Sequence, residues 1–171
     1  KGNFDRKRAA ELIKQQESLS ASTGVPGMVA MVANSPEEAK IYIDFFVETT
    51  KMPFGIDMWV AEQRAKATEY VAELGLQDRF LYNSITPWDR DVKGQVAKLK
   101  DLGIRHVVVQ AFDDKDQSPQ GRVNSLERLL EQGAGDFDTV IVDTSVMNLP
   151  ATSFSLAANR LIKEKLGLPC G

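Results

Sequence analysis

The sequence predicts a parallel α/β barrel of the eight-fold TIM type, of which these 171 residues form most but not all. Two observations predict it. Short apolar runs recur at intervals of about 26 residues along most of the chain. The segments between the runs have the spacing of amphipathic helices, and three of them end in the same way. A regular alternation of strand and helix builds a parallel sheet.

Five apolar runs are the predicted strands. Most of their residues are β-branched or aromatic, and they show no alternation with polar residues, which favours strands buried on both faces. In chain order they are Met28–Val32, Phe54–Asp57, Arg79–Asn83, His106–Gln110 and Thr139–Asp143. A sixth run begins at Leu168–Cys170.

The segments between these runs predict helices. Ser35–Glu38 supplies an N-cap serine, a proline at the first helical position and a capping-box glutamate. Apolar residues then recur at helical spacing and form one stripe, a pattern that two later segments repeat. The three stripes are Ala39, Ile43, Phe46 and Val47; Val92, Val96 and Leu99; and Phe154, Ala158, Leu161 and Ile162.

Three of the predicted helices end in Leu-Gly followed by an apolar residue. Gly75, Gly103 and Gly167 occupy the position where a left-handed C-cap forms, and the next apolar residue can fold back on the helix. A predicted strand follows each of them. These turns support the assignment of a repeated strand-helix unit.

The count of elements predicts an incomplete barrel. The chain opens with a helix, about Asp5 to Leu19, that no strand precedes, and it closes on a strand that no helix follows. A complete barrel typically needs about 250 residues. We therefore expect residues 1–171 to form a single barrel domain that lacks the first strand and the last units. An open doubly wound sheet is the alternative, because it would be complete at this length.

Composition narrows the function. The net charge of −3 gives no basic excess to hold a phosphate backbone, so we expect no nucleic-acid partner. No apolar run approaches the roughly 18 residues of a membrane span, and no signal peptide is visible. Cys170 is the only cysteine, which excludes an internal disulfide and fits a reducing cytoplasm.

Four predicted strands end in a carboxylate or a carboxamide: Asp57, Asn83, Gln110 and Asp143. The ends of parallel strands lie at one edge of a sheet, and in a barrel they ring one cavity. Each residue alone could simply start a loop or cap the next helix. Together, with no lysine, cysteine or histidine among them, they indicate a hydrogen-bonding pocket for a neutral, amide-rich ring.

Other candidates carry less weight. His106, the only histidine, starts a strand and is expected to be structural, and no histidine or cysteine cluster suggests zinc. The acidic stretch Asp113–Asp116 is expected to be a solvated loop, so we predict no metal site. Ser84, Ser145 and Cys170 have no histidine partner in view, which argues against a catalytic triad. Trp59 and Trp88 follow strand ends, where they could shield a flat ligand or only pack loops.

At these strand ends the sequence resembles a known family, the H subunit of tetrahydromethanopterin S-methyltransferase, which includes bacterial relatives that methylate tetrahydrofolate. The resemblance covers nearly the whole chain, and its Tyr-Asn-Ser-Ile and Ile-Val-Asp-Thr pieces are the most specific. The segments that carry it are Lys1–Asp5, Tyr42–Phe45, Pro53–Asp57, Leu81–Ile85, Gln110–Phe112, Ile141–Thr144 and Phe154–Pro169.

The resemblance implies a pterin-binding barrel in which Asp57, Asn83 and Asp143 hydrogen-bond the pterin ring. It implies a methyltransferase that moves a methyl group between a corrinoid carried by a partner protein and tetrahydrofolate or tetrahydromethanopterin. Asn83 is the expected catalytic residue, and Gln110 joins the expected pterin site. A further asparagine of the family would follow the strand that begins at Leu168. We also expect a homodimer.

Two other functions stay open at this stage. One is a non-catalytic pterin-binding protein whose active partner lies elsewhere in a methyltransferase complex. The other is a condensing enzyme like dihydropteroate synthase, which would favour a basic residue near the pocket. Arg90 is the only lysine or arginine that the sequence suggests near these strand ends.

Overall fold

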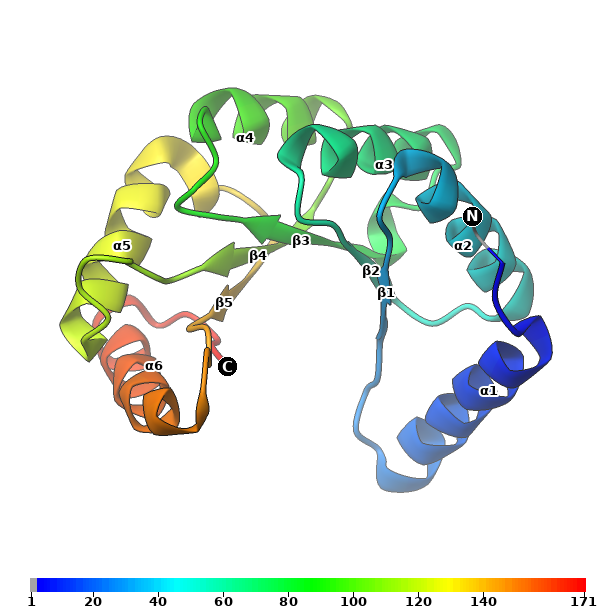
Figure 1. The fold of residues 1–171 in the computed structure, drawn as a ribbon, viewed down its shortest axis with the longest axis horizontal. Helices are drawn as coiled ribbons and strands as arrows, with labels where there is room; N and C mark the ends of the chain where they lie inside the picture. Colours follow the sequence, from blue (N-terminus) through cyan, green and yellow to red (C-terminus); the bar gives the residue numbers. More distant parts are fainter. Residues whose placement is uncertain (1–2) are drawn as a thin grey trace. The chain divides into compact units, whose positions relative to one another are not determined.

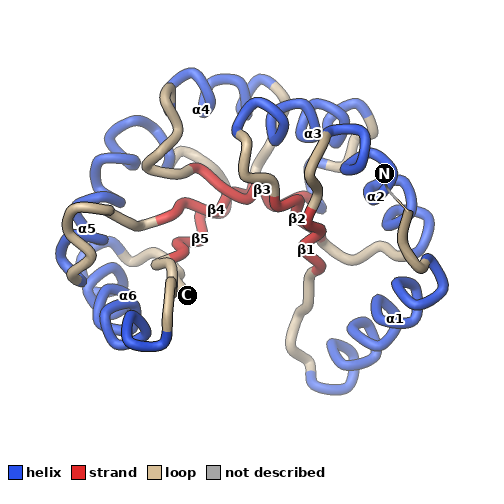
Figure 2. Tube along the Cα trace, viewed as in Figure 1, coloured by secondary structure: helices blue, strands red, loops and turns tan. Residues whose placement is uncertain are grey.

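The computed structural model describes residues 3–171, and Lys1 and Gly2 of the first family-like segment lie outside the described residues. The chain forms two compact units, which meet in sequence between Leu81 and Tyr82. Figures 1 and 2 show the alternation of strand and helix in both units. A predominantly βα chain is therefore confirmed.

The strands follow sequence order within one sheet, β1-β2-β3-β4-β5. The β1–β2 and β4–β5 pairings are parallel. A doubly wound sheet reverses its order at a switch point, and the described strands show no such reversal. The strand bounds are β1 Val29–Val32, β2 Phe54–Asp57, β3 Phe80–Ile85, β4 His106–Gln110 and β5 Thr139–Asp143.

In the first unit, local capping fixes the helices. α1 (Arg6–Thr23) begins where the Asp5 carboxylate accepts the Arg8 N–H at 2.9 Å, and it runs past the predicted end to Gly24. Ser35 caps α2 (Pro36–Thr49) as predicted, by accepting the Glu38 N–H at 3.2 Å. The Glu38 carboxylate accepts the N–H of Asn34, one residue before the position that a capping box uses.

Aromatic packing holds the core of the first unit. Phe54 on β2 lies 5.3 Å from Phe46 on α2 and 5.4 Å from Phe80 on β3, centroid to centroid, and all three are buried. Arg79, in a short 3-10 turn (Gln77–Arg79), lies against Phe46 and Phe54 and donates to the carbonyls of Thr50 and Met52. α2 also packs against α3 (Ala61–Glu73).

In the second unit, helices follow β3, β4 and β5. They are α4 (Val92–Asp101), α5 (Pro119–Leu129) and α6 (Thr152–Leu166). α5 packs along α6, as Figure 1 shows. A π-helical turn (Leu130–Ala134) extends α5, and a 3-10 turn (Leu149–Ala151) precedes α6. The predicted stripe on α4 is buried throughout.

The prediction of strands buried on both faces is wrong for β1, β3, β4 and β5. Burial alternates along β4 and β5, so that Val107, Val109, Val140 and Val142 are buried while the residues between them are only partly covered. No residue of β1 is buried. Among the described residues, close packing therefore reaches only one face of β4 and β5, although their apolar sequence would suit two.

The predicted sixth strand is represented only by one isolated bridge among the described residues. Cys170 forms an isolated parallel bridge with Val142 of β5, and the Gly171 N–H donates to the Val142 carbonyl at 2.9 Å. The three predicted glycine caps are confirmed, with φ of 67° at Gly75, 73° at Gly103 and 67° at Gly167. Left-handed backbone of this kind favours glycine because it has no Cβ.

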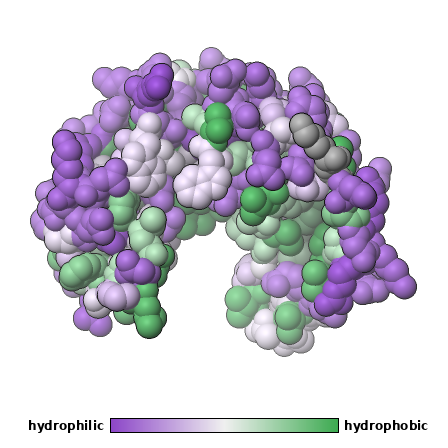
Figure 3. Space-filling model, viewed as in Figure 1, coloured by the Kyte–Doolittle hydropathy of each residue, from purple (hydrophilic) through white to green (hydrophobic). Residues whose placement is uncertain are grey.

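Phe154 departs from its predicted place in the α6 core stripe. Its side chain is 49% exposed, whereas Ser155, Ala158 and Ile162 form the buried face of the helix. Ser155 thus takes the place of Phe154 in the buried stripe, while Ala158 and Ile162 keep theirs. Apolar atoms gather over the β5–α6 loop in Figure 3, where Leu149 is 87% exposed.

None of the helices in residues 3–171 combines the length and the apolar character that crossing a bilayer requires.

Phe54→Ala is expected to lower the free energy of unfolding by about 3–5 kcal/mol, because it opens a cavity between two aromatic neighbours. Phe154→Ala removes the same ring from an exposed position and should cost less than about 1 kcal/mol. Denaturant unfolding of both variants measures the difference. Equal losses would contradict the assignment of these two rings to core and surface.

Candidate functional site

The ends of β4 and β5 bring two of the predicted residues together. Gln110 pairs with Asp143 in the parallel register, and both lie on the partly exposed face of their strands. The Gln110 amide donates to the Ser145 hydroxyl at 2.8 Å. The Ser145 N–H donates to one carboxylate oxygen of Asp143 at 2.7 Å. Ser145 therefore links the two strand-end side chains.

Ser145 itself has left-handed backbone, with φ of 56°. For a residue with a Cβ this conformation costs roughly 1–2 kcal/mol, so surrounding contacts must hold it. The Asp143 carboxylate supplies one of these contacts, in the manner of an Asx turn. The Ser155 hydroxyl of α6 adds a bond at 3.2 Å to the neighbouring Thr144 carbonyl.

Two further contacts to this segment come from Arg122 on α5, which no sequence pattern had singled out. Its side chain is fully buried, and Nη1 donates to the carbonyl oxygens of Thr144 and Ser145, the latter at 3.0 Å. The guanidinium also lies 5.2 Å from the ring centre of Phe112. Burial lowers the pKa of Arg122, and the negative charge of Asp143 opposes that shift.

The sequence held one signal for Arg122. It lies four and seven residues before Leu126 and Leu129, both buried, so a charged residue occupies the apolar stripe of α5. Charged side chains are rarely buried fully unless they are paired. A cation at a core position of a helix therefore predicts a buried polar contact, although not its partner.

The prediction that Asn83 ends its strand is wrong, because β3 continues to Ile85; Asn83 lies within the strand, half-buried and on the same face as Leu81. No side chain of the described residues hydrogen-bonds to its amide. Tyr82, which the sequence places beside it, points to the opposite, buried face, where its hydroxyl accepts from Gln95 of α4 at 2.7 Å. The second unit thus contains three of the four predicted residues: Asn83, Gln110 and Asp143.

Asp57 belongs to the first unit, at the end of β2, where it pairs with Val32. The residue after it, Met58, is buried, and its carbonyl accepts from Nη1 of Arg64 at 2.9 Å. Arg64, on α3, is 4% exposed. The Asp57 carboxylate has no hydrogen-bond partner in the described part of the chain, so it can accept from a ligand.

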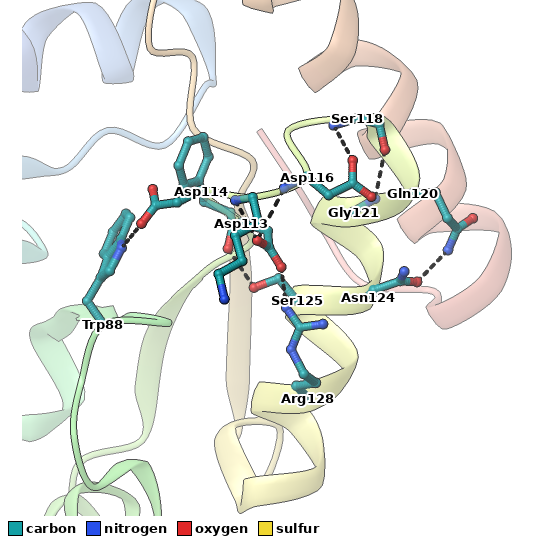
Figure 4. Close-up of polar contacts among 12 residues, drawn as sticks. Trp88, Asp113, Asp114, Asp116, Ser118, Gln120, Gly121, Asn124, Ser125 and Arg128 are labelled. Atoms are coloured by element: carbon teal, nitrogen blue, oxygen red, sulfur yellow. Dashed lines mark hydrogen bonds and ion pairs between the residues drawn. The ribbon is translucent and has the colours of Figure 1, made fainter.

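The acidic loop after β4 bonds to the protein itself, as Figure 4 shows. Asp113 accepts the Lys115 N–H at 2.9 Å and pairs with Arg128 at 2.6 Å. That backbone bond, more than the ion pair, lowers the pKa of Asp113. Asp116 accepts the Ser118 N–H at 3.0 Å. Within residues 3–171 no group of three or more acidic, histidine or cysteine side chains could hold a metal ion.

Trp88 connects the loops after β3 and β4. Its indole N–H donates to Asp114 at 3.0 Å, its ring lies 5.8 Å from that of Phe112, and the side chain is 48% exposed. Because Phe112 also contacts the Arg122 guanidinium, these two loops are joined to α5. The arrangement leaves part of a flat aromatic surface open to a ligand. Trp59 is 92% exposed, so it packs against little.

Other predicted candidates have structural contacts. His106 bonds through Nδ1 to the Thr139 hydroxyl at 2.9 Å, at the start of β4 and β5. Cys170 donates to the Asn159 carbonyl at 3.3 Å, and burial raises the pKa of its thiol. Neither residue contacts the link that Ser145 makes between Gln110 and Asp143.

Asp114→Ala is expected to free the Trp88 ring, because it removes the acceptor for the indole N–H. In a Trp59→Phe background Trp88 is the only tryptophan, and its fluorescence should become easier to quench with a neutral quencher. Asp116→Ala is the matched control, since Asp116 bonds within its own loop. Unchanged quenching in the Asp114 variant would show that ring packing alone holds Trp88.

Comparison with known proteins agrees with the resemblance seen in the sequence. The family described as "Tetrahydromethanopterin S-methyltransferase MtrH subunit" matches residues 1–171. The chain is 34% identical to the H subunit of tetrahydromethanopterin S-methyltransferase from Methanosarcina acetivorans, over 100% of this chain and 57% of the relative. It is 32% identical to the corresponding protein of Methanopyrus kandleri, over 100% of this chain and 56% of the relative.

The chain therefore spans about half the length of the curated relatives it matches. The match nevertheless extends over every residue that forms the strand ends described above. The chain belongs to the MtrH subunit family of tetrahydromethanopterin S-methyltransferase.

Proposed function

We propose that this chain supplies the pterin-binding part of a methyltransferase that moves a methyl group between a corrinoid protein and a tetrahydropterin. The proposed pterin is tetrahydrofolate or tetrahydromethanopterin. The observation that carries the proposal is the link between Gln110, Ser145 and Asp143 at the strand ends, in segments that match the MtrH subunit family. The sheet is proposed to be part of a TIM barrel.

The chemistry of the donor set fits a pterin ring. Asp143 has one carboxylate oxygen bonded to Ser145, and its other oxygen has no partner in the described residues. That oxygen and the Asp57 carboxylate can accept from an exocyclic amine and a ring N–H. Asn83 can both donate and accept, so it suits an edge whose protonation changes.

Methyl transfer needs help at the pterin nitrogen. The methyl group moves between a tertiary ring nitrogen and cobalt, and a neutral amine is a poor leaving group. Protonation or a strong hydrogen bond at that nitrogen assists departure, and positioning supplies much of the rest. In this proposal Asn83 bonds to the edge of the ring that changes charge, and Asp143 accepts from its donor edge.

A corrinoid, when it is bound on its own protein, supplies the cobalt that exchanges the methyl group. This chain then needs no resident metal, and its residues bind and orient the pterin. Homodimer formation and a cytoplasmic location remain predictions. A non-catalytic subunit would bind pterin in the same way, and only an assay of methyl transfer separates the two.

The two arginines that the structure adds near the strand ends do not favour the dihydropteroate-synthase-like alternative. The sequence suggested only Arg90 there, and the structure adds Arg64 and Arg122. Both of these side chains are buried and donate to backbone carbonyls. They therefore do not offer a cation to a ligand.

Asp57→Ala and Asp143→Ala are each expected to weaken tetrahydropterin binding by about 1.5–3 kcal/mol, the usual cost of losing a hydrogen bond to a charged group. Calorimetric titration of the full-length protein measures the loss. Asp138→Ala is the matched control, because that exposed carboxylate pairs with Arg105 before β5 starts. Unchanged affinity in both test variants would remove these residues from the site.

Asn83→Ala is expected to lower the rate of methyl transfer about 10- to 1000-fold with a smaller change in pterin affinity, because only bonds that tighten in the transition state raise turnover. Single-turnover transfer from the methylated corrinoid protein to tetrahydropterin measures the rate. Asn83→Asp keeps the shape but loses the donor, and should also be slow. A variant that binds tenfold weaker yet transfers normally at saturation would make Asn83 a binding residue only.

A further inference from the structure

Arg122 hydrogen-bonds to the backbone that directly follows Asp143. Its Nη1 holds the carbonyls of Thr144 and Ser145, the two residues that follow Asp143. The Ser145 N–H is the group that binds the Asp143 carboxylate, at 2.7 Å. Any shift of this short segment would move the donor that orients the carboxylate. The guanidinium is thus bonded to the two residues that directly follow Asp143, a proposed pterin contact.

Stability alone does not account for an arginine at this place. Its Nη2 is buried and has no hydrogen-bond partner among the described residues. An unsatisfied buried donor lowers stability, and apolar residues often replace buried charges without loss of stability. A methionine of similar length would avoid this cost, but it could not hold two carbonyl oxygens.

The first unit repeats the arrangement with different residues. Arg64 is almost fully buried, and it donates to the carbonyl of Met58, the residue that follows Asp57. The two cases arise from different parts of the chain. Arg64 comes from the helix after β2, whereas Arg122 comes from the helix before β5. Two independent contacts therefore place a buried guanidinium on the backbone just after a strand-end aspartate.

We propose that Arg122 and Arg64 are positioning residues, each of which fixes the carboxylate of Asp143 or Asp57 by holding the backbone that follows it. This inference rests on the proposed function, because it assumes that these two carboxylates bind the pterin. Neither arginine touches the ligand. The expected consequence of loosening either one is weaker pterin binding in a protein that is still folded.

Arg122→Lys and Arg64→Lys test the inference in the full-length protein. Lysine keeps the positive charge, but its compact ammonium on a flexible stem lacks the rigid planar geometry that sets where the guanidinium N–H groups meet the carbonyl oxygens. We expect each variant to bind tetrahydrofolate or tetrahydromethanopterin about tenfold more weakly, since small misplacements of a binding group are costly. Calorimetry gives the affinity, and denaturant unfolding shows that the variants are folded at the temperature of the titration.

Arg79→Lys is the matched control. Arg79 is also largely covered and also donates to two backbone carbonyls, but those of Thr50 and Met52 precede β2. It should lose stability without a change in pterin affinity of more than roughly twofold. An equal loss of affinity in this control would mean that any weakened core weakens binding, and would overturn the inference.

A double-mutant cycle separates positioning from a general structural effect. If Arg122 acts through Asp143, then Arg122→Lys changes affinity by less than roughly twofold once Asp143→Ala is present. An undiminished tenfold loss in that background would overturn the inference for Arg122. The same cycle with Arg64 and Asp57 decides the matter if Arg122→Lys does not fold.

The failure of the inference differs from the failure of the proposed function. If Asp143→Ala and Asp57→Ala weaken binding while both lysine variants bind normally, the aspartates are pterin contacts and the arginines do not position them. If neither aspartate variant changes the affinity for either tetrahydropterin, the proposed site itself is wrong, and the positioning role falls with it.

Discussion

The candidate site in the second unit depends on a buried guanidinium that is bonded to backbone carbonyls. Arg122, on α5, hydrogen-bonds to the backbone just after β5, at the start of the next loop. The left-handed Ser145 is held there, and through its N–H and hydroxyl it binds Asp143 and Gln110. Without the Arg122 hydrogen bonds, fewer contacts would offset the cost of the left-handed backbone at Ser145.

The sequence predicted the strands closely where apolar runs are bounded by clear turns. The limits of β2, β4 and β5 match the predicted runs, because the run of apolar residues and the polar residue at its end mark the same boundary. The sequence did not predict which residues of the strands are buried. Alternating exposure in β4 and β5 depends on which faces are covered, and that is a tertiary property. Phe154 was misplaced for a related reason, since Phe154 and Ser155 both lie at helical spacing from Ala158 and tertiary packing decides which of them is buried.

The candidate residues could partly be predicted from the sequence, but the residues that hold them in place could not. Asp57, Gln110 and Asp143 were found because they end strands, which a local pattern reveals. Asn83 was found because it ends an apolar run, although β3 continues past it to Ile85. Ser145 was considered only as a nucleophile, because the sequence does not show a positive φ at a residue other than glycine. Arg64 follows its aspartate by a few residues, whereas Arg122 precedes its own by a helix and a strand. Because the spacing between arginine and aspartate differs in the two cases, no sequence motif could reveal the contact that they share.

The placement of the two arginines also bears on what the strand ends can bind. A cation that faced the ligand would compete for the carboxylates and would attract anions instead of a neutral ring. With its guanidinium turned to carbonyl oxygens and fully buried, Arg122 leaves one oxygen of Asp143 unbonded by the described residues. Its charge still attracts that carboxylate, and the low dielectric of the interior strengthens the attraction. The arrangement thus combines a charged support with an unbonded carboxylate oxygen, which suits the donor edge of the proposed pterin.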